Sequence, residues 1–359
     1  MSAPANLQCT IKKLVARTNL SSVEISKALD AILGGTTPDA AVAAFLVALA
    51  MKGETADEIR SVVRSLINHA TRITPKVSGP LVDTCGTGGG SIRSFNISTA
   101  AAIVAAAASA KVAKHGNRSL SGICGSADFL EYIGLDLSTP SAKIQSCIEE
   151  VGIAFLFAPM FHPSMKNVAP IRKTIGISTV FNKVGPLSNP CTNIAGQVIG
   201  VFEMPLMDLF SDVCKDYMKE VMLVHARDGF DELSNTCRND ICWISNRNHR
   251  ATKMLLHPND VGLKLATPEQ LIVYSKEDSI VSTLQTIYGN ASWEKHDIVV
   301  LNAAAALLLS DIASSFKEGI QIADEIIESG KASKKLSELI KYCGKPEKLN
   351  EAEKKFSLI

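Results

Sequence analysis

The stretch that decides the fold begins with DTCGTGGGS (83–91), continues through FNIST (95–99) and ends with KHGNR (114–118). Each of these clusters is polar, and apolar residues separate them. A glycine-rich turn exposes backbone N–H groups, so a phosphate can approach closely. We interpret the three clusters together as a cradle for a heavily phosphorylated ligand.

The start of an Ala-rich run strengthens this interpretation. Asn96, Ser98 and Thr99 precede AAAIVAAAASA, which predicts a buried helix, and a helix N-terminus rich in hydroxyl and amide groups binds anions. Lys114 and Arg118 add positive charge after the next apolar segment. The glycine loop alone is not specific, because it is neither a GxGxxG fingerprint nor a Walker motif. The order and closeness of all three clusters favour a functional site over three solvated loops.

The composition is that of an ordinary globular enzyme. The 359 residues include 37 Lys and Arg against 36 Asp and Glu, a net charge of +1, so no charge excess indicates nucleic acid or an anionic membrane as a partner. The nine cysteines are scattered and form no CxxC pair, as is typical of free thiols in a reducing compartment. No signal-peptide pattern or membrane-spanning apolar run is present. We therefore expect a cytoplasmic protein.

Hydrophobic periodicity predicts helices throughout residues 1–72, with a capping box at Ser21–Glu24, and then strands that alternate with helices. An inserted segment at 162–190 interrupts the alternation. From His296 we expect one more strand and a long helical region, and after Lys331 a basic, polar tail that forms a solvated helix and a frayed end. The alternation predicts an α/β domain with a mostly parallel sheet. The expected strands are 80–85, 111–113, 153–157, 196–202 and 221–225, followed by an antiparallel hairpin at 240–245 and 251–256.

Longer motifs accompany these clusters and occur in one order along most of residues 66–309. They are FNISTAAA, KHGNRSLSGICGSADFLEYIG, FAPMFHPSMKNVAPIRKTIGISTVFNKVGPLSNP, GFDEL and DIVVLNAAAALLL. In these motifs the chain resembles the anthranilate phosphoribosyltransferases. The resemblance implies transfer of the phosphoribosyl group of phosphoribosyl pyrophosphate (PRPP) to the amine of anthranilate. The products are N-(5-phosphoribosyl)anthranilate and pyrophosphate, in tryptophan biosynthesis.

The resemblance also implies a fold of the nucleoside phosphorylase and phosphoribosyltransferase kind, with a small all-helical domain and a large α/β domain. The helical domain would be 1–75, with part of 162–190 packed on it, and the phosphoribosyl-transfer domain 76–161 and 191–359. The active site would lie between the two domains, and the protein would form a homodimer through the helical domain. PRPP and anthranilate would be its small-molecule partners, with no role for nucleic acid or membrane.

The resemblance assigns ligand contacts to the three clusters and to the GFDEL motif. Magnesium would be held by Ser98, Asp231 and Glu232, which leaves positions for phosphate oxygens and water. Anthranilate would contact Gly86, Asn117, Arg172, whose guanidinium matches a carboxylate, and His162. PRPP would contact Gly86, Gly89, Gly90, Ser94, Asn96, Ile97, Ser98, Thr99, Lys114, His115, Gly116, Asn117, Arg118, Ser119, Leu120, Ser121, Gly122 and Ser126.

Without the resemblance, several of these residues favour simpler interpretations. Asp231 and Glu232 would be a solvated acidic loop and Arg172 would form a surface ion pair, whereas for His162 a structural role and a contact with the acceptor are about equally expected. No residue is expected to act as nucleophile or general base, because the aromatic amine is neutral at pH 7 and attacks directly. The family's glycine loop commonly ends in Asp where this chain has Gly90, which removes a negative charge beside the pyrophosphate.

Two other functions remain open at this point. A pyrimidine-nucleoside phosphorylase resembles the same fold and also acts at an anomeric carbon, but KHGNR, GPLSNP and GFDEL argue against it. A non-catalytic relative would bind nucleic acid through a basic cleft. The near-zero net charge and the intact Asp-Glu pair argue against that function.

Overall fold

A computed structural model of the chain describes residues 5–88, 92–119, 123–215, 217–248 and 250–359. The chain divides into two compact units. The helical unit is Met1–Arg72 with Pro159–Pro190, and the α/β unit is Ile73–Ala158 with Cys191–Ile359. Each unit is described by itself below.

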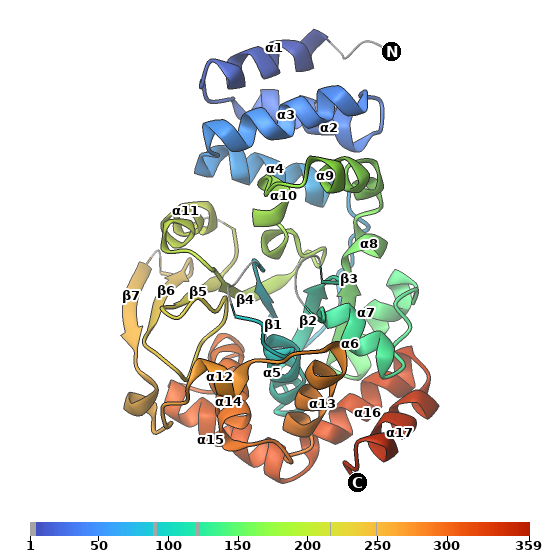
Figure 1. Cartoon of the computed structure of the whole chain (residues 1–359), viewed down its shortest axis with the longest axis vertical. Helices are drawn as coiled ribbons and strands as arrows, with labels where there is room; N and C mark the ends of the chain where they lie inside the picture. The colour runs from blue at the N-terminus through green and yellow to red at the C-terminus, as the bar shows by residue number, and fades with distance from the viewer. Residues whose placement is uncertain (1–4, 89–91, 120–122, 216, 249) are drawn as a thin grey trace. The chain divides into compact units, whose positions relative to one another are not determined.

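The helical unit combines the N-terminal helices with the inserted segment (Figure 1). The short helix α8 (Ala158–Phe161) leads into that segment. The other elements of the unit are α1 (Ala5–Val15), α2 (Ser22–Leu33), α3 (Asp39–Lys52), α4 (Ala56–Asn68), η1 (Pro163–Asn167), α9 (Ala169–Ile175), α10 (Val180–Lys183) and η2 (Pro186–Ser188).

Local sequence explains where these helices begin. Ser21 and Glu24 form the predicted capping box at the start of α2, which confirms that prediction. The buried carboxylate of Glu58 then joins three parts of the unit. It accepts hydrogen bonds from the backbone N–H of Leu20 at 2.8 Å and from Lys52 Nζ at 2.7 Å, at the end of α3. Lys183 of α10 pairs with Glu54 at 2.6 Å, so the inserted segment is bound to the α3–α4 corner.

The α/β unit contains a seven-stranded sheet in the order β3-β2-β1-β4-β5-β6-β7 (Figure 1). The first five strands in sequence are parallel, and the last two add as an antiparallel hairpin. Both features were predicted and are confirmed. The strands are β1 (Leu81–Gly86), β2 (Lys111–Gly116), β3 (Ile153–Phe157), β4 (Ile194–Gly200), β5 (Glu220–Ala226), β6 (Asn239–Ser245) and β7 (Arg250–Leu256).

Helices pack on this sheet and on one another. The Ala-rich helix α5 (Ile97–Ala107) is buried along its length, as predicted. The others are α6 (Ser126–Tyr132), α7 (Ser141–Glu150), α11 (Met204–Cys214), η3 (Pro258–Val261), α12 (Pro268–Leu271), α13 (Lys276–Ile287), α14 (Trp293–Leu309), α15 (Phe316–Glu328), α16 (Lys331–Cys343) and α17 (Pro346–Lys355).

Two predictions for the C-terminal third were wrong. The strand expected from His296 is part of α14, which begins after Ser292. Its Ile298-Val299-Val300 run has high strand propensity, but the helix packs against α5, α15 and β4 and is buried on nearly all sides. Tertiary packing therefore outweighs local preference.

The tail after Lys331 is helical, as predicted, but it is neither solvated on all sides nor frayed. It forms α16 and α17, and α16 packs against α5 and α7. Leu336, Leu339, Ile340 and Cys343 are buried. Their spacing is that of one apolar helix face, which the surrounding lysines obscure in the sequence.

The sheet order places the site. From β1 the chain adds β2 and then β3 on one side of the sheet. It then returns to place β4 on the other side of β1. Ligands of parallel α/β sheets bind outside the carboxyl ends of the strands where the order reverses in this way. The glycine loop follows β1 at that point.

Candidate active site

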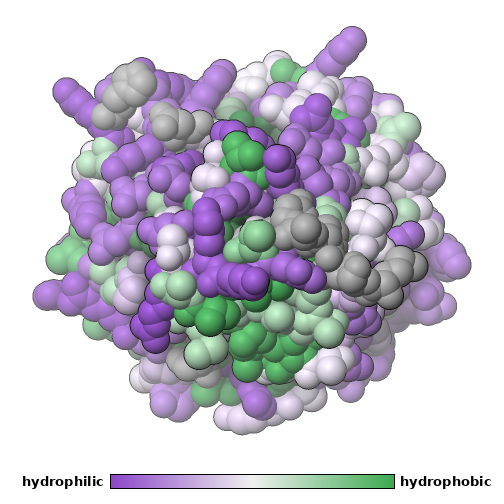
Figure 2. Space-filling view, turned by 90° about the horizontal axis from the view of Figure 1, so that it is seen from above, coloured by the Kyte–Doolittle hydropathy of each residue, from purple (hydrophilic) through white to green (hydrophobic). Residues whose placement is uncertain are grey.

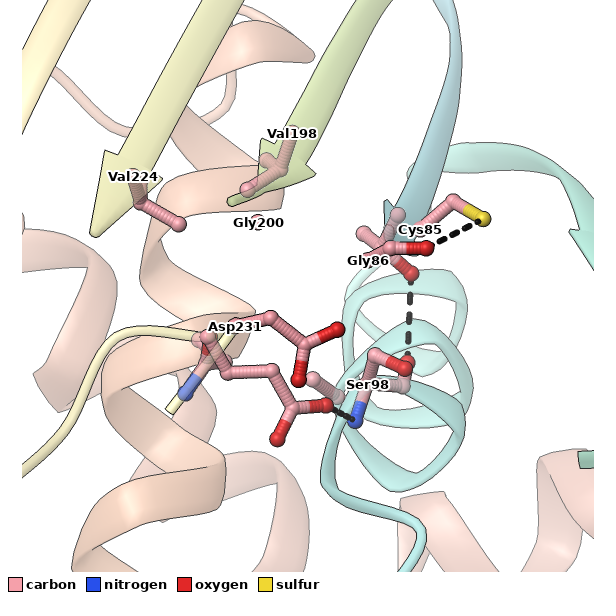
Figure 3. A pocket seen from close by; sticks show the side chains of 11 residues that line it. Cys85, Gly86, Ser98, Val198, Gly200, Val224 and Asp231 are labelled. Carbon is pink, nitrogen blue, oxygen red and sulfur yellow. Dashed lines mark hydrogen bonds between the residues drawn. The ribbon is translucent and has the colours of Figure 1, made fainter. Parts of the chain in front are cut away.

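The site is built around two carboxylates in the loop between β5 and β6. Asp231 and Glu232 point toward the end of β1 and the first turn of α5 (Figure 3). Asp231 Oδ2 accepts a hydrogen bond from the backbone N–H of Gly88 at 2.7 Å. Glu232 Oε1 accepts one from the backbone N–H of Ser98 at 2.9 Å. The pair therefore binds the glycine loop at Gly88 and the first turn of α5 at Ser98.

Two glycines make room for this loop. A Cβ atom on Gly200, the last residue of β4, would overlap the backbone carbonyl of Asp231. A Cβ on Gly86, at the end of β1, would overlap the Asp231 carboxylate. The apolar neighbours of the pair, Phe230 and Leu233, are buried. The carboxylates thus lie against the sheet edge, not in the solvated acidic loop that the sequence alone favours.

Burial alters the acidity of the pair. Desolvation, and then the negative charge of Asp231, raise the pKa of Glu232 to about 8. Burial also raises the pKa of Asp231. Hydrogen bonding at Ser98 and the charge of Lys114 offset only part of this effect on the Glu232 pKa. A site with two ionised carboxylates therefore needs a further positive charge beside it.

A small cavity of about 10 Å³ adjoins the pair (Figure 3). Its lining includes Thr84, Ser98, Asp231, Glu232 and Asn302, and it has room for one water-sized species. Within the described parts of the chain, no three His, Cys, Asp or Glu side chains are grouped as a metal cage. Two carboxylates and a hydroxyl still fit Mg²⁺, because that ion keeps phosphate oxygens and water among its ligands.

Lys114 lies under the first turn of α5. Its side chain is buried, and Nζ donates to the Thr84 carbonyl at 2.6 Å and to Ser98 Oγ at 3.3 Å. The Thr84 hydroxyl in turn donates to the Ser98 carbonyl at 3.1 Å. The expected positive charge is therefore present at the site, and part of its bonding capacity orients Ser98.

Asp83 is a buried carboxylate that the sequence analysis did not single out. It links β1 to the strands on either side of it, β2 and β4. In the β1–β2 ladder, Leu81 pairs with Lys111 and Val82 pairs with Val112. Beyond it, Asp83 Oδ1 accepts from the backbone N–H of His115 at 3.2 Å, and Oδ2 accepts from Gln197 Nε2 at 2.9 Å.

The KHGNR segment is hydrogen-bonded to acidic side chains of α6. Asp128 Oδ2 accepts from the backbone N–H groups of Ser119 at 3.1 Å and Gly125 at 3.0 Å. Burial acts to raise the pKa of Asp128, but these bonds and Arg118 outweigh it, so the pKa is lowered. Arg118 also pairs with Glu131 at 2.7 Å. Its side chain is thus engaged with acidic residues of α6.

The other predicted PRPP residues surround this edge. Asn96 donates through its backbone to Thr283 Oγ1 and through Nδ2 to Ser279 Oγ, both on α13. Ser126 Oγ donates to the Asn117 carbonyl at 3.3 Å. Ser94 forms an isolated bridge with Ile272. Ile97, Thr99 and His115 are buried, and Gly116 ends β2. Gly89, Gly90, Leu120, Ser121 and Gly122 lie outside the described residues.

Arg172 and His162 belong to the helical unit. Arg172 Nη2 donates to Asn182 Oδ1 at 2.9 Å, and its guanidinium lies over the Phe181 ring. Burial lowers its pKa, and within the described residues no carboxylate pairs with it. The surface ion pair considered above is therefore not formed. His162 is buried, with Nε2 2.9 Å from the Ser188 carbonyl, which is a structural environment.

Comparison with known proteins identifies the family. Residues 78–333 match the profile of the "Glycosyl transferase family, a/b domain", and residues 8–70 match its "helical bundle domain". An anthranilate phosphoribosyltransferase of Acetivibrio thermocellus is 43% identical over 337 residues, which cover 94% of this chain and 96% of that protein. The chain belongs to the anthranilate phosphoribosyltransferase family.

Solved structures of this family agree with the fold. The Saccharomyces cerevisiae anthranilate phosphoribosyltransferase in complex with PRPP and Mg has a TM-score of 0.87 at 27% identity, covering 95% of this chain and 98% of that one. The same yeast enzyme in complex with 4-fluoroanthranilate has a TM-score of 0.84 at 27% identity, with 94% and 98% covered. In the described part of this chain, no helix has the length and apolarity needed to cross a bilayer.

Proposed function

We propose that this chain catalyses the reaction of its family, the transfer of the phosphoribosyl group of PRPP to the amine of anthranilate with release of pyrophosphate. The observation that carries the proposal is the Asp231–Glu232 pair, hydrogen-bonded to Gly88 and Ser98 at the carboxyl edge of the sheet. Such a reaction needs little covalent chemistry from the protein. It needs the two substrates held in line and the charge of the leaving group balanced.

The α/β unit supplies the PRPP side of this reaction. The glycine-rich sequence after β1 and the first turn of α5 would offer backbone N–H groups to the phosphates. Asp231, Glu232 and Ser98 would hold Mg²⁺, which neutralises the departing pyrophosphate when it is bound. The charge of Lys114 at Ser98 adds to that electrostatic balance. The KHGNR backbone, closed by Asp128, completes the PRPP contacts.

Arg172 supplies the acceptor side. Its guanidinium is half-buried and is bound to the neutral amide of Asn182 rather than to an acid. That environment suits a bidentate bond to the carboxylate of anthranilate. Asn117 and the Gly86 backbone would adjoin the aromatic ring, and the neutral amine attacks the anomeric carbon without a protein base.

Anthranilate fluorescence tests the proposal directly. The purified protein should consume anthranilate only when PRPP and Mg²⁺ are both present, and excess EDTA should abolish the reaction. Full activity in EDTA would contradict the magnesium assignment. Cleavage of a pyrimidine nucleoside by inorganic phosphate, without anthranilate consumption, would instead identify a phosphorylase.

We also propose that the chain forms a homodimer through its helical unit. Val15, Val23 and Met51 are large apolar side chains exposed on α1, α2 and α3. Figure 2 shows hydrophobic areas on a face that is otherwise mostly hydrophilic. Burial of exposed apolar groups stabilises association. Analytical ultracentrifugation should give a dimer for the parent and a weakened dimer for Met51→Glu, and a monomeric parent would refute the proposal.

A further inference from the structure

Asn302 of α14 forms an unusually complete set of bonds with the loop that carries the carboxylate pair. Its Oδ1 accepts a hydrogen bond from the backbone N–H of Leu233 at 3.1 Å. Its Nδ2 donates to the carbonyl of Leu233 at 2.7 Å and to that of Ile298 at 2.8 Å. One side chain thus pairs both backbone polar groups of Leu233, as a neighbouring strand would.

The position of this contact gives it consequences for the site. Leu233 directly follows Glu232, and its side chain is fully buried. Asn302 itself is 6% exposed and lines the same cavity as Ser98, Asp231 and Glu232. A shift of Leu233 would therefore move Glu232 relative to Ser98, which lies on a different element.

The closeness of the two carboxylates favours such a shift. Asp231 and Glu232 are adjacent in the chain, each accepts a backbone N–H, from Gly88 and Ser98, and both line the same small cavity. Two carboxylates held together away from bulk water are unfavourable, and the loop would relieve this by moving toward water. Leu233 and Asn302 oppose that movement. If the loop moved outward, the Leu233 side chain would be exposed and the two hydrogen bonds between Leu233 and the Asn302 amide would break.

We propose that Asn302 is a positioning residue of the magnesium and PRPP site, which fixes the Asp231–Glu232 loop through the backbone of Leu233. The identity of the ligand, Mg²⁺ with PRPP, rests on the proposed function. The anchoring of the loop by Asn302 does not. The amide does not touch substrate in this role. It keeps the two carboxylates in position for the cation.

Asn302→Ala tests the role against a matched control. Asn246 is also an asparagine of the α/β unit whose Nδ2 donates to two backbone carbonyls, those of Cys214 at 3.0 Å and Met218 at 2.6 Å. It lies away from the acidic loop, at the other end of β6. Asn302→Ala should raise the half-saturating Mg²⁺ concentration by about ten- to a hundredfold, as the loss of an outer-shell partner does. Asn246→Ala should lower thermal stability but leave the Mg²⁺ and anthranilate dependence unchanged.

A second readout does not depend on activity. Hydrogen exchange of peptides that cover residues 229–235 should be faster in Asn302→Ala than in the parent without ligand, and unchanged in Asn246→Ala. Equal exchange in parent and Asn302→Ala would overturn the proposal even if the enzyme assay fails altogether. If the alanine variant does not fold, Asn302→Gln displaces the amide by one methylene and should show the same changes in direction. Parental Mg²⁺ dependence in a folded Asn302 variant would also overturn it.

Discussion

Glu232 accepts the backbone N–H of Ser98 across 134 positions of sequence, and this bond joins the β5–β6 loop to the N-terminus of α5. An acidic group at a helix N-terminus is favoured by the helix dipole. Here it also occupies the place where phosphate oxygens would approach. In the proposed function the same carboxylate would hold this contact before ligand binding and the Mg²⁺ ion after it.

The raised pKa of Glu232 predicts how magnesium binding depends on pH. An ordinary Glu in the unfolded chain loses its proton near 4.5, whereas Glu232 in the folded protein keeps it to about 8. Between these values the native state binds the extra proton, so the stability of the metal-free protein falls as pH rises. Because Mg²⁺ must displace that proton, its affinity should rise with pH up to about 8 and then level off.

Glu232→Gln is the control for this pH profile. Linkage of one proton makes the parental slope at most about tenfold in Mg²⁺ affinity per pH unit. The Gln variant should bind Mg²⁺ weakly. The pH dependence of its Mg²⁺ affinity should reflect only the ionisation of PRPP. Isothermal titration at several pH values in both proteins measures the difference, and parallel profiles would contradict the assignment.

Arg172→Ala should raise the anthranilate KM far more than the PRPP KM. Loss of a charged hydrogen-bonded pair in a partly buried site costs about 2–4 kcal/mol. The neighbouring exposed Lys173 provides the control, since Lys173→Ala should leave both KM values near those of the parent. Steady-state kinetics with each substrate varied in turn make the comparison. Equal increases in both KM values would mean that Arg172 is structural.

Gly200→Ala should destabilise the protein more than Gly86→Ala does. The new methyl group at Gly200 meets the backbone of Asp231, which has no free rotation to relieve the overlap. At Gly86 it overlaps mainly the end of the Asp231 side chain, which can turn away at the cost of its bond to Gly88, and it meets the Asp231 carbonyl oxygen only at 3.0 Å. Overpacking of this kind costs about 1–3 kcal/mol.

Urea unfolding should rank the two glycine variants in that order, and both should need more Mg²⁺ for activity. Gly185→Ala is the neutral comparison, because a Cβ there meets nothing within 4 Å and φ is −50°. A Gly200→Ala protein with parental stability would contradict the described packing.

Asp83→Asn should lower the free energy of unfolding by about 1–3 kcal/mol, the cost of leaving a buried donor unsatisfied. The new amide turns an N–H group toward either the His115 backbone or Gln197, both of which donate to Asp83. Asp240→Asn, which removes the partner of the exposed Arg227, should cost less than about 1 kcal/mol. Chemical denaturation of both variants gives the comparison. Similar losses would show that the Asp83 bonds contribute little.

Local signals in the sequence predicted much of this structure. Alternating apolar runs gave the parallel strands and the hairpin, and Ser21 with Glu24 marked a helix start. The glycine loop and the hydroxyl-rich start of α5 indicated the edge where ligands bind. These features depend on residues that are neighbours along the chain, so a pattern can report them.

The remainder depends on contacts between distant segments. Ile298-Val299-Val300 favours a strand locally, and only its burial among helices makes it α14. The hydrogen bonds that Asn302 donates to Leu233 and that Gln197 donates to Asp83 join residues without any shared local motif. The sequence predicted that Lys114 would bind phosphate. Its bonds to Thr84 and Ser98 depend on the register of β1 and β2, which no local pattern reports.

The packing of α5 against α13, α14, α15 and α16 has a consequence for how the protein is made. The Ala-rich helix leaves the ribosome early, at residues 97–107, whereas its last covering helix is α16 at 331–343. Its apolar surface therefore stays open to solvent and to other chains through most of translation. Nascent chains that stall before α16 should be the species that chaperones retain and that aggregate when chaperones are scarce.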